Sequence, residues 1–216
     1  AMLALGLVVA GPAAAEDTVK IGLMAPITGA WAAEGQDMKQ ICELLADQVN
    51  AGGGLLGKKV VLEVADDGGN EQTAALAAQR LVTKGIAAVV GTYGSSVTEA
   101  SQGIYDAAKI PQIANGSTAV RLTEKGLKYF FRTSPRDDEQ GRVAAKTLME
   151  KGYKKIAILH DNTTYAKGLA EETQAILVKE PVEIVFFDAL TPGEQDYTDR
   201  KSTRLNSSHV SQLLFR

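Results

Sequence analysis

The clearest local pattern in the chain is Val89-Val90-Gly91-Thr92-Tyr93-Gly94-Ser95-Ser96-Val97-Thr98. The apolar run at 86–90 is typical of a buried strand, and the two glycines that follow let the backbone turn without a Cβ penalty. Apolar residues at helical spacing over 97–109 predict a helix, for which Ser95 and Ser96 are favourable N-cap residues. The stretch therefore predicts a strand, a glycine turn and a helix.

The start of this helix is a candidate ligand site. Free N–H groups and the positive end of the helix dipole attract an anion there. In an open α/β sheet, ligands lie at the carboxyl ends of the strands, which is where this turn is expected. We expect Ser95, with Tyr93 and Gly94 beside it, to hold a small carboxylate. The alternative is an ordinary capped helix that binds nothing.

The same alternation of strand and helix runs through the first part of the chain. Strand patterns occupy residues 19–24, 59–65, 86–90 and 110–114, and helix patterns occupy 36–50, 71–84 and 97–109. Short links between them indicate βαβ units and a parallel sheet with right-handed crossovers. The turns after three of these strands should then meet at one sheet edge and form a crevice: residues 26–29, 91–95 and 115–118.

The first predicted helix has an apolar stripe that we expect to face the core: Met38, Ile41, Leu44, Leu45 and Val49. A further strand at 129–134 connects this series to a second one, with helices at 137–151 and 165–179 and strands at 155–160 and 182–187. We predict an α/β fold of two βαβ lobes with parallel sheets. The N-terminal lobe spans residues 16–125, and residues 126–198 form the second lobe together with the connecting strand.

Composition narrows the classes of function. The 216 residues are 45% hydrophobic and 23% charged, with a net charge of −3, which is typical of a globular protein and gives no basic patch for nucleic acid. Cys42 is the only cysteine, and His160 and His209 are the only histidines. These exclude an internal disulfide, a cysteine metal cluster and a histidine triad within this sequence. No nucleophile with a base is set out, so we expect neither an enzyme nor a cofactor.

The first fifteen residues read as the remnant of a signal peptide. Residues 2–10 are an apolar run too short to span a bilayer, and Ala13-Ala14-Ala15 supplies the small residues of a cleavage site before Glu16. We expect export to the periplasm. The alternative is a buried N-terminal strand or helix.

From Asp17 to Thr198 the chain resembles the periplasmic branched-chain amino-acid binding proteins of ABC transporters, which have the type I periplasmic-binding fold. The matching segments occur in order along the chain at residues 22–29, 66–67, 90–98, 116–118, 131–133 and 160–168. The resemblance implies a monomeric two-lobed clamp that closes on an amino acid and delivers it to an inner-membrane ABC permease.

The resemblance also implies roles for residues. Ser95 and the turn Gly116-Ser117-Thr118 match the groups that hold the ligand's α-carboxylate and ammonium, and Tyr165 matches a tyrosine of the second lobe that covers the ligand. Glu34 stands where relatives often have an aromatic residue, and Trp31 supplies the apolar wall instead. An amide, urea or an aromatic acid is therefore an alternative ligand. A sensory ligand-binding domain and an α/β enzyme using the same crevice are alternative functions.

Residues 199–216 do not resemble the family. They read like one translation frame of a sequencing-library adapter, so we predict a truncated chain with an incomplete second lobe and a non-native tail that packs on nothing. The acidic residue that binds the ammonium in the family lies beyond this chain. The alternative is a genuine flexible C-terminus.

Overall fold

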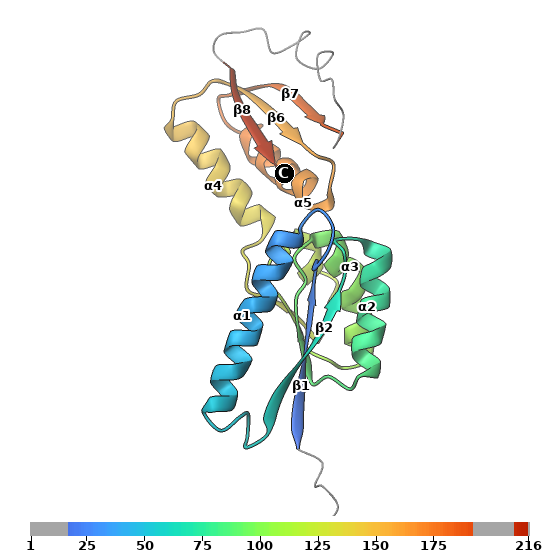
Figure 1. Cartoon of the computed structure of the whole chain (residues 1–216). Helices are drawn as coiled ribbons and strands as arrows, with labels where there is room; N and C mark the ends of the chain where they lie inside the picture. Colours follow the sequence, from blue (N-terminus) through green and yellow to red (C-terminus); the bar gives the residue numbers. More distant parts are fainter. Residues whose placement is uncertain (1–16, 192–209, 216) are drawn as a thin grey trace, which may run out of the picture.

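The computed structural model describes residues 17–191 and 210–215. It consists of two α/β lobes, each built on a parallel sheet (Figure 1). This confirms the predicted fold class. The predicted signal segment at 1–15 and most of the predicted tail lie outside the described residues.

The first lobe contains a parallel sheet with the order β2-β1-β3-β4-β5. Its strands are β1 (Thr18–Ala25), β2 (Lys59–Asp66), β3 (Ala88–Val90), β4 (Gln112–Ala114) and β5 (Phe130–Arg132). Its helices are α1 (Ala32–Ala51), α2 (Glu71–Thr83) and α3 (Ser95–Ala107), followed by a short 3₁₀ helix at Val120–Thr123. Because β1, β3 and β4 are neighbours, the turns after them meet at one edge, as expected.

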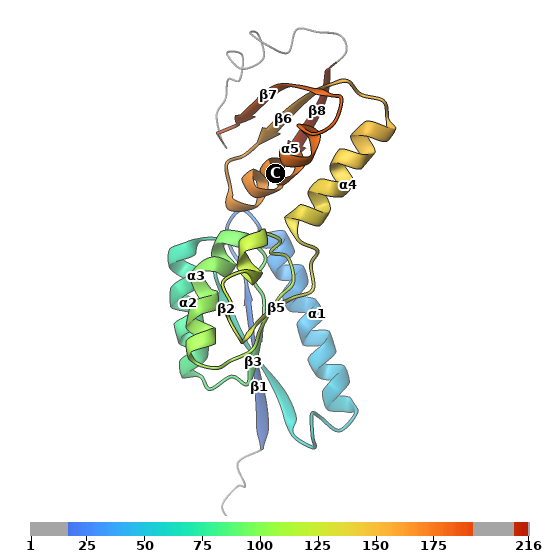
Figure 2. The ribbon, with the colours of Figure 1, turned by 180° about the vertical axis from the view of Figure 1, so that it is seen from behind.

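The main core of this lobe lies between the sheet and the pair α2 and α3, on the opposite side from α1 (Figures 1 and 2). Met24, Leu81, Val89, Val97 and Tyr105 are fully or almost fully buried there. Tyr105 donates a hydrogen bond to the Met24 sulfur at 3.2 Å, so even the polar end of this large side chain is satisfied.

The predicted core stripe of α1 is largely wrong. Ile41, Leu44, Leu45 and Val49 are 59%, 57%, 52% and 41% exposed. The helix packs on β1 and β2 at one side of the sheet, so only part of its apolar surface meets the strands. Ile113 of β4 and Phe131 of β5 are also exposed. The sequence pattern located the apolar stripe correctly but could not show what covers it.

The second lobe has the sheet order β7-β6-β8. It comprises α4 (Asp137–Glu150), β6 (Lys155–His160), α5 (Thr164–Leu177), β7 (Glu183–Ala189) and β8 (Val210–Phe215). The placement of β6 between β7 and β8 repeats that of β1 between β2 and β3. Helices α4 and α5 pack together over a core that includes Ile156, Ile158 and Leu177.

The structure differs from two predictions, one on the boundary between the lobes and one on the packing of the tail. β5 pairs with β4 in the first sheet, so the first lobe extends to Arg132 and the predicted division at 125 and 126 is too early. The tail was expected to pack on nothing, yet β8 pairs with β6 in parallel along its whole length. The free edge of β6 exposes N–H and C=O groups, and the segment 210–215 satisfies them.

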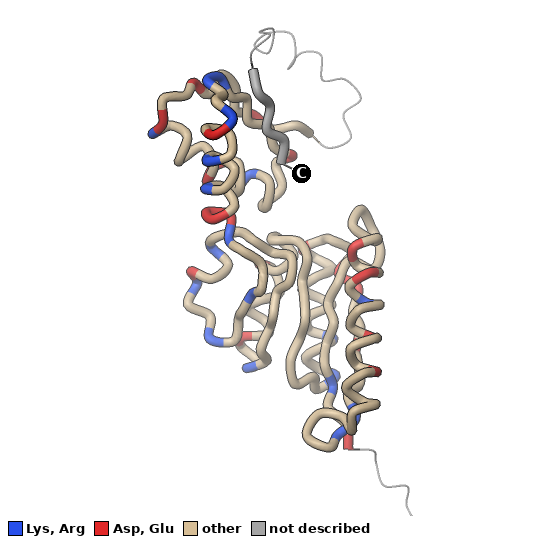
Figure 3. The backbone as a smooth tube through the Cα atoms, turned by 90° about the vertical axis from the view of Figure 1, so that its left-hand side faces the viewer, with Lys and Arg blue, Asp and Glu red and all other residues tan. Residues whose placement is uncertain are grey.

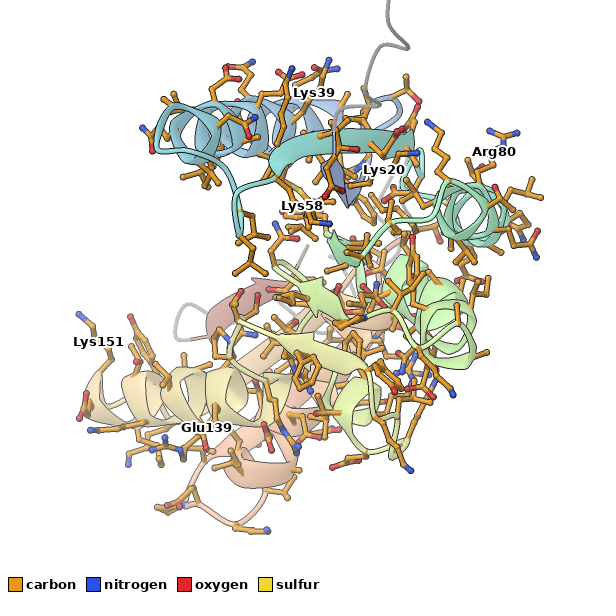
Figure 4. The ribbon with its side chains drawn as sticks, turned by 90° about the horizontal axis from the view of Figure 1, so that it is seen from below. Lys20, Lys39, Lys58, Arg80, Glu139 and Lys151 are labelled. Carbon is orange, nitrogen blue, oxygen red and sulfur yellow. The ribbon has the colours of Figure 1, made fainter. Side chains whose placement is uncertain are left out.

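Charges of both signs alternate over the outer surface. Blue and red segments are interspersed along the helices in Figure 3, and in Figure 4 the labelled Lys39, Arg80 and Lys151 point away from the sheets. Several form helical ion pairs, such as Lys39 with Glu43 and Lys146 with Glu150. Across residues 17–191 and 210–215, the helices are all too short or too polar to cross a membrane.

Candidate ligand-binding site

A cavity of about 340 Å³ lies where the two lobes meet. This volume is at the lower end of the range for small-molecule sites, roughly 300–1,000 Å³. The first lobe lines it with the N-cap residue of α1 and with residues that follow β3, β4 and β5, and the second lobe lines it with residues at the starts of α4 and α5. The lining residues are Trp31, Tyr93, Gly94, Ser95, Ser96, Gly116, Thr118, Ser134, Pro135, Gln140, Asp161, Thr163, Thr164 and Tyr165.

Ser95 occupies the first position of α3 rather than its N-cap. Gly94 is the N-cap, with an extended backbone and no capping side chain, and its carbonyl accepts from Thr98 N at 3.0 Å. The expectation that Ser95 or Ser96 caps the helix is therefore wrong. Instead, Ser95 Oγ accepts hydrogen bonds from the backbone N–H groups of Thr118 and Ala119, both at 3.3 Å. The two bonds use the acceptor capacity of the hydroxyl and leave its O–H available to donate.

Ser117 does not line the cavity. Its side chain is buried, and its Oγ lies 3.0 Å from the carbonyl of Thr92 and 3.2 Å from the carbonyls of Tyr93 and Gly94. It also shares a hydrogen bond with the hydroxyl of Thr98. These contacts hold the turn before α3 in place, and the expected contact of Ser117 with a ligand stays a prediction. Its neighbours Gly116 and Thr118 are at the cavity surface.

Aromatic side chains form the apolar part of the cavity. The rings of Trp31 and Tyr93 meet edge to face, with centroids 5.7 Å apart and an interplanar angle of 66°. Tyr165 approaches from α5 in the second lobe. Glu34 lies exposed in the first turn of α1 and is not a lining residue, so the structure does not support its predicted place in the site.

The polar groups of the cavity favour an anion without a buried counter-charge. The lining residues include no Lys, Arg or His, and Asp161 is their only carboxylate. Residues in or just before the first turns of α3, α4 and α5 line the cavity, so the positive ends of three helices are near it. Asp161 accepts hydrogen bonds from the Thr163 backbone and hydroxyl, and Thr163 in turn caps α5.

Two titratable groups near the cavity have raised pKa values. Burial raises the pKa of the Tyr165 hydroxyl, helped by the negative charges of Asp137 and Asp161, so Tyr165 remains an O–H donor at neutral pH. Burial also raises the pKa of Asp137 to about 6, against the opposing effects of the Thr118 hydroxyl and Arg132. Asp137 Oδ2 is buried and has no hydrogen-bond partner of normal geometry among the described residues.

Sequence reasoning missed the contributions of Ser134, Gln140, Asp161 and Thr163. In parallel sheets, ligands bind at the carboxyl ends of the strands, and the sequence analysis used this rule for the first lobe. Applied to the second lobe, the same rule indicates Asp161 and Thr163, because they follow β6 at its carboxyl end. In the described part of the chain, the acidic, His and Cys side chains form no group of three or more that could hold a metal ion.

The sequence profile of a family described as "Periplasmic binding protein" matches residues 18–200. The chain belongs to the periplasmic binding protein family. Among members of this family, the Leu/Ile/Val-binding protein BraC3 of Rhizobium johnstonii is 38% identical over 198 residues, which cover 91% of this chain and 54% of that protein. The Amino acid binding protein of Pseudomonas aeruginosa is 40% identical over 199 residues, covering 91% and 53% respectively.

Solved structures of the family share the fold. The substrate binding protein LivJ of Streptococcus pneumoniae, crystallised with isoleucine, superposes with a TM-score of 0.83 at 28% identity, covering 91% of this chain and 56% of that one. This chain thus spans about half the length of the periplasmic binding proteins that it matches.

Proposed function

We propose that this chain belongs to the substrate-binding component of an ABC importer, which binds a branched-chain amino acid between its two lobes and delivers it to a membrane permease. We place it in the periplasm, as a monomer that binds its ligand without converting it. The observation that carries the proposal is the cavity itself, where three helix N-termini meet an apolar wall of Trp31 and Tyr93. The names of the Rhizobium and Streptococcus relatives support the choice of ligand.

The roles of the residues follow from their positions. The Ser95 hydroxyl and the free N–H groups of the first turn of α3 donate to the α-carboxylate, with Gly116 and Thr118 beside them. Such donors suit a desolvated site because they leave no unpaired charge when it is empty. Trp31 and Tyr93 contact the ligand's aliphatic side chain. Tyr165 covers the ligand when the lobes close.

Trp31 provides the test, because it is the only tryptophan in the sequence and lines the cavity. Titration with L-isoleucine, L-leucine and L-valine should change its fluorescence and give saturable heat in calorimetry. D-isoleucine is the matched control, since it carries the same side chain in the wrong geometry for the carboxylate donors. Binding of urea, an amide or 4-hydroxybenzoate in preference to the L-amino acids would refute the proposal. Turnover of a bound ligand would favour the enzyme alternative.

A further inference from the structure

The aromatic wall of the cavity is held against three glycines. A Cβ atom built on Gly94 would lie 2.7 Å from Cζ3 and 3.2 Å from Cη2 of Trp31, and one built on Gly69 would lie 2.9 Å from Trp31 Cε3. A Cβ on Gly116 would lie 2.7 Å from Cδ2 of Tyr93. Non-bonded carbon atoms prefer about 3.5–4.0 Å, so each ring occupies the space that a side chain at these positions would need.

The glycines come from separate loops that meet at the carboxyl edge of the first sheet. Gly69 lies between β2 and α2, Gly94 lies just before α3, and Gly116 follows β4. Trp31, at the N-cap of α1, therefore has backbone from two loops in contact with its indole ring. Movement of the indole toward either loop is blocked, so the two loops limit how far this wall can withdraw from the cavity.

We propose that Gly69, Gly94 and Gly116 determine ligand specificity by seating Trp31 and Tyr93 and thereby setting how large a side chain the cavity accepts. The inference rests on the proposed function for the class of ligand, namely amino acids with branched aliphatic side chains. An added side chain at Gly94 displaces the indole from its seat, and the displaced ring takes space that a branched side chain needs. A ligand with a small side chain, such as alanine, does not need that space.

Gly94 is the position at which this can be tested cleanly. Its backbone angles, φ −80° and ψ 143°, suit any residue, so Gly94→Ala adds a methyl group without backbone strain. Gly69, with φ +67°, would be strained by any side chain, and a Cβ on Gly116 would also lie 2.9 Å from the Tyr93 backbone oxygen. Gly103 provides the matched control, because it lies exposed within α3, the helix that Gly94 precedes, and a Cβ there meets nothing within 4 Å.

The experiment compares Gly94→Ala, Gly103→Ala, Trp31→Phe and the double variant Gly94→Ala with Trp31→Phe. Calorimetry with L-isoleucine and L-alanine gives the specificity ratio of each. We expect Gly94→Ala to weaken isoleucine binding at least tenfold while alanine changes less than threefold, and Gly103→Ala to leave both unchanged. The smaller ring of Trp31→Phe should restore isoleucine binding in the double variant to within threefold of Trp31→Phe alone.

A ligand-free measurement separates this inference from the proposed function. Trp31 emission and its quenching by acrylamide should change in Gly94→Ala and not in Gly103→Ala, whether or not the wild type binds isoleucine. Unchanged emission in Gly94→Ala overturns the inference. So does an equal loss of isoleucine and alanine binding that Trp31→Phe fails to restore. Failure of the wild type to bind any branched-chain amino acid counts instead against the proposed function.

Discussion

Replacing Ser95 by alanine should weaken both ligand binding and the fold, by amounts that the structure allows us to work out. Ser95 is 3% exposed and lines the cavity, and in the proposed function its hydroxyl donates to the ligand carboxylate. A hydrogen bond to a charged group contributes about 1.5–3 kcal/mol. Since about 1.4 kcal/mol corresponds to a factor of ten, the dissociation constant for isoleucine should rise roughly 10- to 150-fold.

The effect of Ser95→Ala on stability comes from the hydrogen bonds that Ser95 Oγ accepts within the protein. Without Oγ, the N–H groups of Thr118 and Ala119 lose their acceptor in a buried turn. An unsatisfied buried donor costs about 1–3 kcal/mol. Both bonds are long, at 3.3 Å, so we expect each donor to cost an amount at the low end of this range, and the total loss of unfolding free energy to be about 2 kcal/mol.

Calorimetry with L-isoleucine and urea unfolding measure the two effects separately. Ser101→Ala is the matched control, because Ser101 is a fully buried serine of α3 that accepts from Gln112 and does not line the cavity. It should lower stability without weakening binding. If Ser95→Ala binds isoleucine as tightly as Ser101→Ala does, Ser95 is not a ligand donor and the assignment of the carboxylate to the start of α3 is wrong.

Three further predictions concern stability. Asp137→Asn should raise the unfolding free energy by about 1–3 kcal/mol at pH 7.5 and by little at pH 4, in urea unfolding at both pH values. The pKa of Asp137 in the folded protein, about 6, exceeds the ordinary value of 3.8. The protonated carboxyl therefore stabilises the fold below pH 4, and this contribution is lost as the pH rises through 6. An effect of Asp137→Asn that is the same at both pH values would contradict burial as the cause. Asn70→Ala should lower the melting temperature, losing about 1 kcal/mol, because Asn70 caps α2 by accepting from the N–H groups of Gln72 and Thr73; the exposed neighbour Gln72→Ala serves as the control, and equal losses would rule out the cap. Glu99→Gln, which breaks ion pairs with Arg121 and Lys125, should cost less than about 1 kcal/mol, and a loss that persists in 1 M NaCl would contradict a screened surface pair.

The course of the main chain could be predicted from the sequence, because strand and helix patterns with short links allow few topologies. The meeting of the turns after β1, β3 and β4 follows from parallel strands alone. Ser95 and Ser117 show where this reasoning stops. Both serines follow strands at the same edge, yet one is at the cavity and the other is buried beneath the turn before α3. Which carbonyl and N–H groups lie opposite each hydroxyl depends on how two distant loops pack, and no local pattern records that.

Features that depend on contacts between distant segments were predicted poorly for the same reason. The apolar stripe of α1 is real, but its exposure depends on how much of the helix meets the sheet, and among the strands α1 packs mainly on β1 and β2. The strand β5 has the same local pattern whichever sheet it joins, and only its pairing with β4 shows that it belongs to the first lobe. The segment 210–215 pairs with β6 because that edge is open, which the residues of the segment themselves do not show.

The path of the chain between the two sheets has a mechanical consequence. Among the described residues the backbone passes from the first sheet to the second once, between Arg132 of β5 and Asp137 of α4. A single covalent connection behaves as a swivel: it permits twisting of one lobe about the other as well as bending. A ligand held between them must then suppress both motions, and that ordering costs binding free energy. A second crossing of the backbone would remove the twist and leave one axis of bending. Less motion would then have to be ordered on binding, so affinity would rise without any new contact to the ligand.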